Sequence, residues 1–129
     1  MVLDAHALMV YLEKEEGYEK LEKIFLSSIE KNEELLMTSV NFGEIYYIVM
    51  REIGKEKARE IENVIDSLPI KIINVDKELA KTAANFKAFK KISYADSFAV
   101  ALAKQTGKSL ITGDKEFKSI EKEIKVLWI

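Results

Sequence analysis

The chain has 129 residues, of which 48% are hydrophobic and 33% are charged, and its formal net charge is −2 at pH 7. This length suits one core, so we expect a single domain over residues 1–129. The absence of cysteine excludes disulfides, zinc–thiolate sites and cysteine nucleophiles, and the lone histidine, His6, excludes a histidine-rich metal site. The small net charge argues against nucleic-acid binding by bulk charge but leaves a local basic patch open.

No apolar run approaches the roughly 18 residues that a membrane-spanning helix needs. The N-terminus also lacks the basic region followed by an apolar one that marks a secretory signal. We therefore expect a cytoplasmic protein that has no membrane partner.

Strand and helix signals alternate along the chain. Runs of apolar and β-branched residues predict strands, and apolar residues at three- and four-residue steps predict helices. In chain order the predicted elements are a strand at 1–3, helices at 5–14 and 18–29, a strand at 35–37, helices at 38–53 and 55–68, a strand at 70–75, helices at 76–89 and 93–106, and strands at 109–112 and 124–129. This alternation predicts a mostly parallel sheet with helices on both faces, a three-layer α/β/α sandwich.

Capping residues and helix breakers set several of these boundaries. Thr38 and Ser39 are N-cap residues for the helix that follows them, and Asp76 caps a later helix. Gly54 is a stop signal, and Pro69 marks the start of a strand. The residues expected on inward helix faces include Leu21, Ile24, Phe25 and Ile29 in the second helix and Leu79, Ala83, Phe86 and Phe89 in the fifth.

Acidic residues gather after the predicted strands. Asp4 follows the first strand directly, and Asp114 comes two residues after Thr112, which ends the fourth. Glu44 lies in the early turns of the helix after the second strand, and Asp96 lies in the first turn of the helix that leads into the fourth. Parallel strands end at one edge of a sheet, where ligands bind, so these acids can meet there. Spacing alone does not decide whether Asp96 points into the same cleft.

If these four acids converge, the site holds only carboxylates. Carboxylates within about 4–6 Å of one another repel, which raises their pKa values and costs stability, and a hard divalent cation relieves that repulsion. Oxygen ligands suit Mg²⁺ or Mn²⁺. Such a cation lowers the pKa of bound water and stabilises charge on a phosphoryl oxygen, so the pattern indicates metal-assisted hydrolysis of a phosphodiester.

Four stretches of the chain resemble the PIN domain family, and in particular the VapC-type toxin ribonucleases. They are VLDAHAL at 2–8, TSVNFGE at 38–44, SYAD at 93–96 and LITGDKEF at 110–117, and the likeness extends over the whole chain. The resemblance implies a five-stranded sheet of order 3-2-1-4-5, in which strands one and four are neighbours. It also implies a Mg²⁺- or Mn²⁺-dependent endoribonuclease that is the toxin of a toxin–antitoxin pair.

The resemblance also assigns residues and partners. The metal-binding and catalytic acids of the family match four residues, Asp4, Glu44, Asp96 and Asp114. Thr112 matches a supporting polar residue beside them. The family further implies an RNA substrate, a homodimer and a small antitoxin protein that blocks the cleft.

One position departs from the family pattern. The second residue after the first aspartate is usually Ser or Asn in the family, and in this chain it is His6. This histidine could bind the substrate phosphate, donate a proton, or only pack in the first helical turn. The departure concerns the surroundings of the acids and not the acids themselves.

Other interpretations of the same residues stay open. Asp4 and Asp114 each stand where an N-cap belongs, and Asp96 could complete a capping box that Ser93 opens. Each of the three could therefore be structural, and Glu44 could lie on an exposed face. Lys90 and Lys91 end a lysine-rich stretch that could contact substrate phosphates or form a solvated helix face. The domain could also be a catalytically weak PIN-like module that binds RNA or protein.

Overall fold

Five strands form a single sheet in the computed structural model, which describes residues 1–129. They are β1 (Val2–Leu3), β2 (Leu35–Thr38), β3 (Ile70–Ile73), β4 (Leu110–Thr112) and β5 (Val126–Trp128). Every neighbouring pair is parallel, and the order β3-β2-β1-β4-β5 confirms the expected order. Strand β1 therefore lies between β2 and β4, and Leu3 is paired with Ile111.

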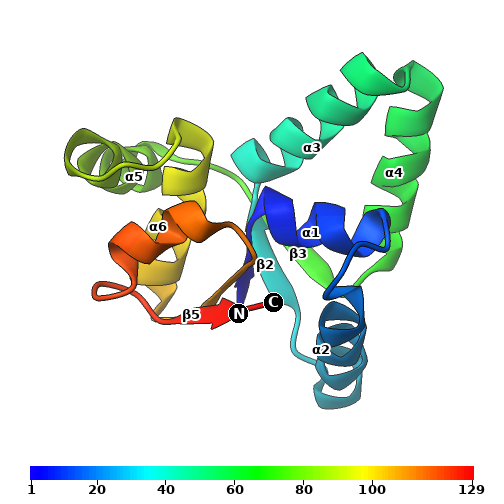
Figure 1. The fold of residues 1–129 in the computed structure, drawn as a ribbon, viewed down its shortest axis with the longest axis horizontal. Coiled ribbons are helices and arrows are strands. Elements are labelled where there is room, and N and C mark those ends of the chain that lie inside the picture. Colours follow the sequence, from blue (N-terminus) through cyan, green and yellow to red (C-terminus); the bar gives the residue numbers. More distant parts are fainter.

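Helices cover both faces of this sheet. They are α1 (Ala5–Leu12), α2 (Tyr18–Lys31), α3 (Ser39–Glu52), α4 (Lys55–Ser67), α5 (Lys77–Phe89), α6 (Tyr94–Thr106) and the 3₁₀ helix η1 (Lys115–Ile120). Figure 1 shows α5 and α6 on one side of the sheet and α1, α2 and α4 on the other. The predicted three-layer α/β/α sandwich is confirmed. None of the helices combines the length and the apolar character needed to cross a bilayer.

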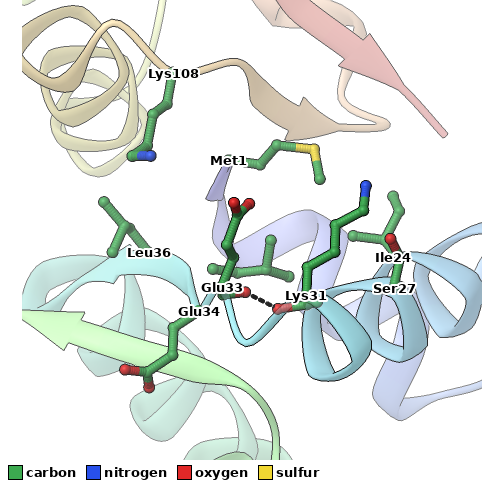
Figure 2. A pocket seen from close by; sticks show the side chains of 10 residues that line it. Met1, Ile24, Ser27, Lys31, Glu33, Glu34, Leu36 and Lys108 are labelled. Atoms are coloured by element: carbon green, nitrogen blue, oxygen red, sulfur yellow. Dashed lines mark hydrogen bonds between the residues drawn. The ribbon is translucent and has the colours of Figure 1, made fainter.

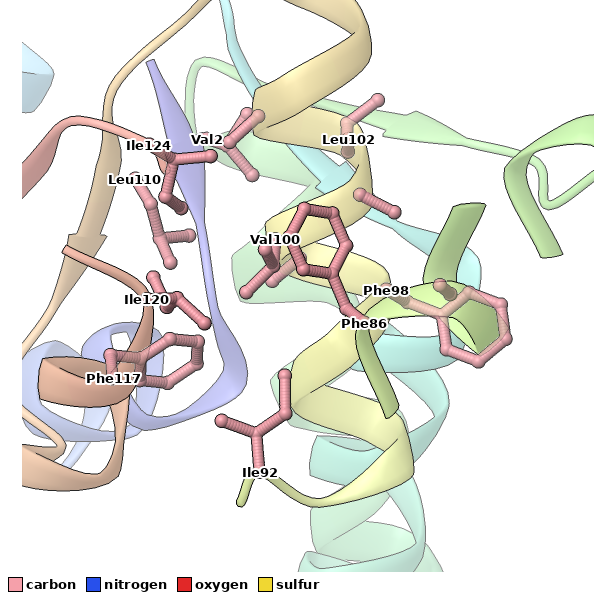
Figure 3. Packing of buried hydrophobic residues seen from close by; sticks show 14 of the residues in the cluster. Val2, Phe86, Ile92, Phe98, Val100, Leu102, Leu110, Phe117, Ile120 and Ile124 are labelled. Carbon is pink, nitrogen blue, oxygen red and sulfur yellow. The ribbon is translucent and has the colours of Figure 1, made fainter. Parts of the chain in front are cut away.

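Each face of the sheet builds its own core because side chains alternate along a strand. Val2 and Leu110 pack with residues of α5 and α6, whereas Leu3 and Ile111 pack with residues of α1 and α3. All four side chains are fully buried. Figure 3 shows the first of these cores, where the strand residues meet Phe117 and the inward face of α6. Burial on both faces explains the continuous apolar runs of the central strands.

Small residues allow α6 to pack closely against its neighbours. Ala99, Ala101 and Ala103 are no more than 1% exposed, and the helix lies against α3, α5, β1 and β2. Because α6 leads into β4, its first turn lies at the carboxyl edge of the parallel sheet. The packing therefore carries Asp96 to that edge.

The structure shortens two of the predicted strands. The strand expected at 70–75 ends at Ile73, because its neighbour β2 ends at Thr38 and offers no partner beyond that pair. The strand expected at 124–129 is limited to Val126–Trp128, because β4 has only three residues with which to pair. Strand ends thus follow the length of the neighbouring strand.

The structure also differs from the predicted helices, in one helix end and in one additional helix. The helix expected at 5–14 ends at Leu12, since Lys14 has a left-handed backbone with φ 53°. Sequence patterns predicted no element over residues 113–123, yet η1 forms there and buries Phe117 and Ile120, which are three residues apart. That spacing brings side chains into line in a 3₁₀ helix.

Two residues that were expected in the core lie at the surface. Phe89 is 81% exposed because it is the last residue of α5, beyond the contact that buries Phe86. Ile29 is 62% exposed because α2 turns a different line of residues inward, Leu21, Phe25 and Ser28.

The contrast between two phenylalanines gives a stability prediction. Phe117→Ala should lower the free energy of unfolding by about 3–5 kcal/mol, because it leaves a cavity in the core under α6. Phe89→Ala is the matched control and should change it by less than about 0.5 kcal/mol, because that ring is in solvent. Urea denaturation followed by circular dichroism measures both values, and equal losses would contradict the arrangement described above.

Candidate functional site

The pairing of β1 with β4 brings two polar residues together at the carboxyl edge of the sheet. Asp4 follows β1 directly, and Thr112 is the last residue of β4. The Thr112 hydroxyl donates a hydrogen bond to Oδ2 of Asp4. The same hydroxyl oxygen accepts a hydrogen bond from the backbone N–H of Asp114 at 3.0 Å. Thr112 therefore links the acid after β1 to the acid after β4.

Asp4 is fully buried, and both of its carboxylate oxygens have partners. Oδ1 accepts a hydrogen bond from the backbone N–H of Ala7 at 2.7 Å, so Asp4 does cap α1. Burial is the main cause that raises the pKa of Asp4 to about 7. The charges of Asp96 and Asp114 contribute to this shift, and the hydrogen bonds from Thr112 and Ala7 oppose it. A role as a helix cap is thus compatible with membership of a cluster of acids.

Asp96 lies in the first turn of α6, which Ser93 caps. The Ser93 hydroxyl accepts a hydrogen bond from the backbone N–H of Asp96 at 3.1 Å. Burial raises the pKa of Asp96 to about 6; the Ser93 hydroxyl opposes this shift, and the charges of Asp114 and Glu116 add to it. Carboxylate oxygens of Asp96 and Asp114 lie within 4.8 Å of each other, so Asp96 does point toward Asp114, which spacing alone had left undecided.

Glu44 reaches the same edge from α3. Its side chain is half-buried, although the sequence also allowed an exposed position. Burial raises the pKa of Glu44, and the charges of Asp96 and Asp114 raise it further. Asp4 and Glu44, two of the four acids predicted from the sequence, thus each lie within electrostatic reach of the other two, Asp96 and Asp114.

A fifth acid, Glu116, joins the cluster and was missed from the sequence. Carboxylate oxygens of Asp96, Asp114 and Glu116 all lie within 4.8 Å of one another. Asp114 caps η1 by accepting a hydrogen bond from the backbone N–H of Glu116 at 2.9 Å, which turns the chain back toward Asp114. The sequence offered one signal, an acidic residue two positions after Asp114. That spacing brings the two acids together only if a helix begins after Asp114.

His6 lies at the border of the cluster. It is exposed in the first turn of α1, and its ring sits over the turn that joins Thr112 to Asp114. A Cβ atom at Gly113 would lie 3.0 Å from Cε1 of His6, so the glycine leaves the space that the ring occupies. The charge of His6 acts to lower the pKa of Asp96. The ring therefore lies beside the turn that leads to Asp114, and a role for it toward a ligand stays a prediction.

The two lysines at the end of the basic stretch have different surroundings. Lys90 forms an ion pair with Glu123 at 3.1 Å. Lys91 is exposed on the loop that leads into α6 and forms no ion pair. A role for either in contacting phosphate stays a prediction.

A cavity of about 410 Å³ opens at the opposite edge of the sheet. Its lining includes Met1, which precedes β1, and Lys108, which precedes β4, so it lies at the amino ends of the strands. Figure 2 shows Lys31, Lys108 and Glu33 around it, a mixture of both charges. The cavity is thus remote from the acid cluster and has a different chemistry.

The donor set of the cluster fits a hard divalent cation. Three carboxylates lie close enough to share one ion, and two of them, Asp96 and Asp114, interact electrostatically with Asp4 and Glu44. All of these donors are oxygens, which Mg²⁺ and Mn²⁺ prefer. Uncompensated carboxylates at these separations destabilise the folded protein, and a bound cation would offset that cost.

Solved structures with the same fold come from toxin–antitoxin systems. A DNA-bound VapBC from Salmonella typhimurium has a TM-score of 0.77 and 16% identity, covering 98% of this chain and 95% of that one. VapBC2 from Rickettsia felis, bound to a promoter DNA fragment, has a TM-score of 0.76 and 18% identity, covering 99% and 97%. VapC20 from Mycobacterium tuberculosis, described as a toxin that cleaves the sarcin–ricin loop, has a TM-score of 0.71 and 15% identity, covering 91% and 92%. At these identities the likeness shows a shared fold.

The sequence comparisons identify the family. A search of curated proteins gave no significant match. The family model of the PIN domain matches residues 1–123, which is nearly the whole chain and includes all five acids of the cluster. The chain therefore belongs to the PIN domain family.

Proposed function

We propose that this protein is a Mg²⁺- or Mn²⁺-dependent endoribonuclease that hydrolyses RNA phosphodiester bonds, and that it is the toxin of a toxin–antitoxin pair. The observation that carries the proposal is the convergence of five carboxylates at the carboxyl edge of the sheet, three of them with raised pKa values. Membership of the PIN family and the fold shared with VapBC toxins support it.

Asp96, Asp114 and Glu116 would hold the cation, with Asp4 adding charge from the buried side. When bound, the cation would lower the pKa of a water molecule and stabilise charge on a phosphoryl oxygen. Thr112 and the N–H of Ala7 keep the Asp4 carboxylate in one orientation. A set of acids that is held rigidly loses little energy to reorganisation during the reaction.

Glu44 and His6 flank the proposed cation ligands. Glu44 is half-buried, and its raised pKa suits a group that orients the attacking water and accepts its proton. His6 is exposed beside Gly113, where it would contact the substrate phosphate. Lys91, exposed and unpaired, would add a contact to the RNA backbone. Attack in line on phosphorus would leave a 5′-phosphate and a 3′-hydroxyl.

Protein partners follow from the same assignment. A small antitoxin would bind this protein and block the acids, as the VapBC complexes suggest. A homodimer is supported by large apolar side chains that are exposed in the single chain. They include Leu26, Ile29, Tyr47, Ile53, Phe89 and Tyr94.

The first prediction from the proposed function concerns activity. Asp4→Asn and Asp96→Asn should each reduce cleavage of RNA by about 100-fold or more, the scale lost with one electrostatic partner of a transition state. Asp76→Asn is the matched control, because Asp76 also caps a helix after a strand but lies outside the cluster. Cleavage of a labelled RNA with Mg²⁺ or Mn²⁺ measures all three variants.

Full activity in both Asp4→Asn and Asp96→Asn, with folding intact, would refute the proposal. Binding of RNA without cleavage by the wild type would favour the alternative of a catalytically weak PIN-like binding module. Loss of activity in Asp76→Asn would show that the assay responds to the helix caps and not to the acid cluster.

The second prediction concerns pH. Below about pH 4 Asp4 is protonated in the folded and unfolded states alike, and between about pH 4 and pH 7 only the folded state keeps the proton. The free energy of unfolding therefore falls as the pH rises, by on the order of 4 kcal/mol from this group. In EDTA, the melting temperature should fall between pH 5 and pH 8 more for the wild type than for Asp4→Asn, which keeps the cap but carries no charge.

Mg²⁺ should reverse this loss. At pH 8 added Mg²⁺ should raise the melting temperature of the wild type more than that of Asp4→Asn, because it binds the folded state and offsets the repulsion. Thermal denaturation with EDTA and with Mg²⁺ measures the difference. Equal shifts in the two proteins would count against a metal site at Asp4.

The third prediction concerns Thr112. Thr112→Val removes the donor to Asp4 and the acceptor for the N–H of Asp114, and it should weaken Mn²⁺ binding by about 10–100-fold. Thr112→Ser keeps the hydroxyl and should bind Mn²⁺ as the wild type does. Isothermal titration calorimetry measures these affinities, and equal binding by the valine and serine variants would exclude the supporting role.

A further inference from the structure

Two helices bring like charges to the same place. Glu44 is carried by α3 and Asp96 by α6, and the charge of Asp96 acts on Glu44. The two helices belong to different layers, since the buried residues of α3 pack with α1 and those of α6 pack with α5. Repulsion between the acids acts to separate the two helices where they meet.

A single side-chain hydrogen bond joins α3 to α6 at this point. The Asn41 amide, through Nδ2, donates to the backbone carbonyl of Ala95 at 3.0 Å. Asn41 is one turn before Glu44, and Ala95 directly precedes Asp96. No ion pair connects the two helices. The bond thus ties the helix that carries Glu44 to the peptide directly before Asp96.

The orientation of the Asn41 amide is set by Thr38, the last residue of β2. The Thr38 hydroxyl donates to Oδ1 of Asn41 at 2.5 Å, and its oxygen accepts from the backbone N–H of Asn41 at 3.1 Å. Because Oδ1 must accept, Nδ2 must face the Ala95 carbonyl. Thr38 and Asn41 are both fully buried. The hydrogen bonds therefore run without a break from the sheet to the first turn of α6.

We propose that Asn41 is a positioning residue that sets the separation between Glu44 and Asp96 in the metal centre. This rests on the proposed function, because it assigns Asn41 a role toward the cation. The peptide that Asn41 binds is the one directly before Asp96, so a shift of that peptide moves the carboxylate. Metal sites tolerate displacements of only about 0.5 Å, and groups that orient the ligands change metal affinity by about 10–100-fold.

The first test is metal affinity, measured by isothermal titration calorimetry of the full chain with Mn²⁺. Asn41→Ala should bind Mn²⁺ at least about tenfold more weakly than the wild type. Ser28→Ala is the matched control, because Ser28 is a buried polar residue whose hydroxyl donates to the Glu33 carbonyl, far from the acids. It should bind Mn²⁺ as the wild type does. Asn41→Ser, whose hydroxyl is too short to reach Ala95, replaces Asn41→Ala if the latter does not fold.

The second test needs no metal. In EDTA at pH 8, Asn41→Ala should lower the melting temperature less in the Asp96→Asn background than in the wild type, because the repulsion that the hydrogen bond opposes has been removed. Ser28→Ala should lower it equally in both backgrounds. If the role of Asn41 is purely structural, Asn41→Ala also lowers the melting temperature by the same amount in both backgrounds.

Equal losses in the two backgrounds, or unchanged Mn²⁺ affinity in Asn41→Ala, would overturn the proposal for Asn41. A wild type that binds no Mn²⁺ and cleaves no RNA would overturn the proposed function. In that case unequal losses in the second test would still establish that Asn41 holds the two acids in place.

Discussion

The parallel pairing of β1 with β4 is the contact on which the rest of the site depends. It aligns Leu3 with Ile111, so that Asp4, which follows β1, and Thr112, the last residue of β4, come within hydrogen-bonding distance. Asp114 follows through its backbone bond to Thr112. A shift of one residue in this pairing would turn every side chain of β4 to the other face and separate the two acids.

The acids reach this edge from both layers of helices. Asp4 and Glu44 belong to the side of α1 and α3, and Asp96 belongs to α6 on the other side. The edge of the sheet is the place where the two layers meet, and there a cluster of like charges can be assembled from separate elements. The alanines of α6 allow the approach, because larger side chains would keep the helix away from the sheet.

The gathering of acids destabilises the folded protein at the carboxyl edge of the sheet. Burial and mutual repulsion raise the pKa values of Asp4, Glu44 and Asp96, so their charged forms destabilise the fold near neutral pH. Two hydrogen bonds lie beside these acids, one from the Thr112 hydroxyl to Asp4 and one from the Asn41 amide to the Ala95 carbonyl. Clusters of groups with perturbed pKa values mark functional sites for this reason.

The sequence by itself determined the local features. Caps at Asp4, Thr38, Asp76 and Ser93 were predicted because each depends on a few neighbouring residues, and apolar runs marked all five strands. The order of the strands came from the likeness to a family and not from spacing.

Only the tertiary structure decided the rest. Asn41 and Ala95 are 54 residues apart, Glu116 depends on a 3₁₀ helix with no clear signal, and the exposure of Phe89 depends on where α5 loses contact. These features are set by long-range packing, which local patterns do not encode.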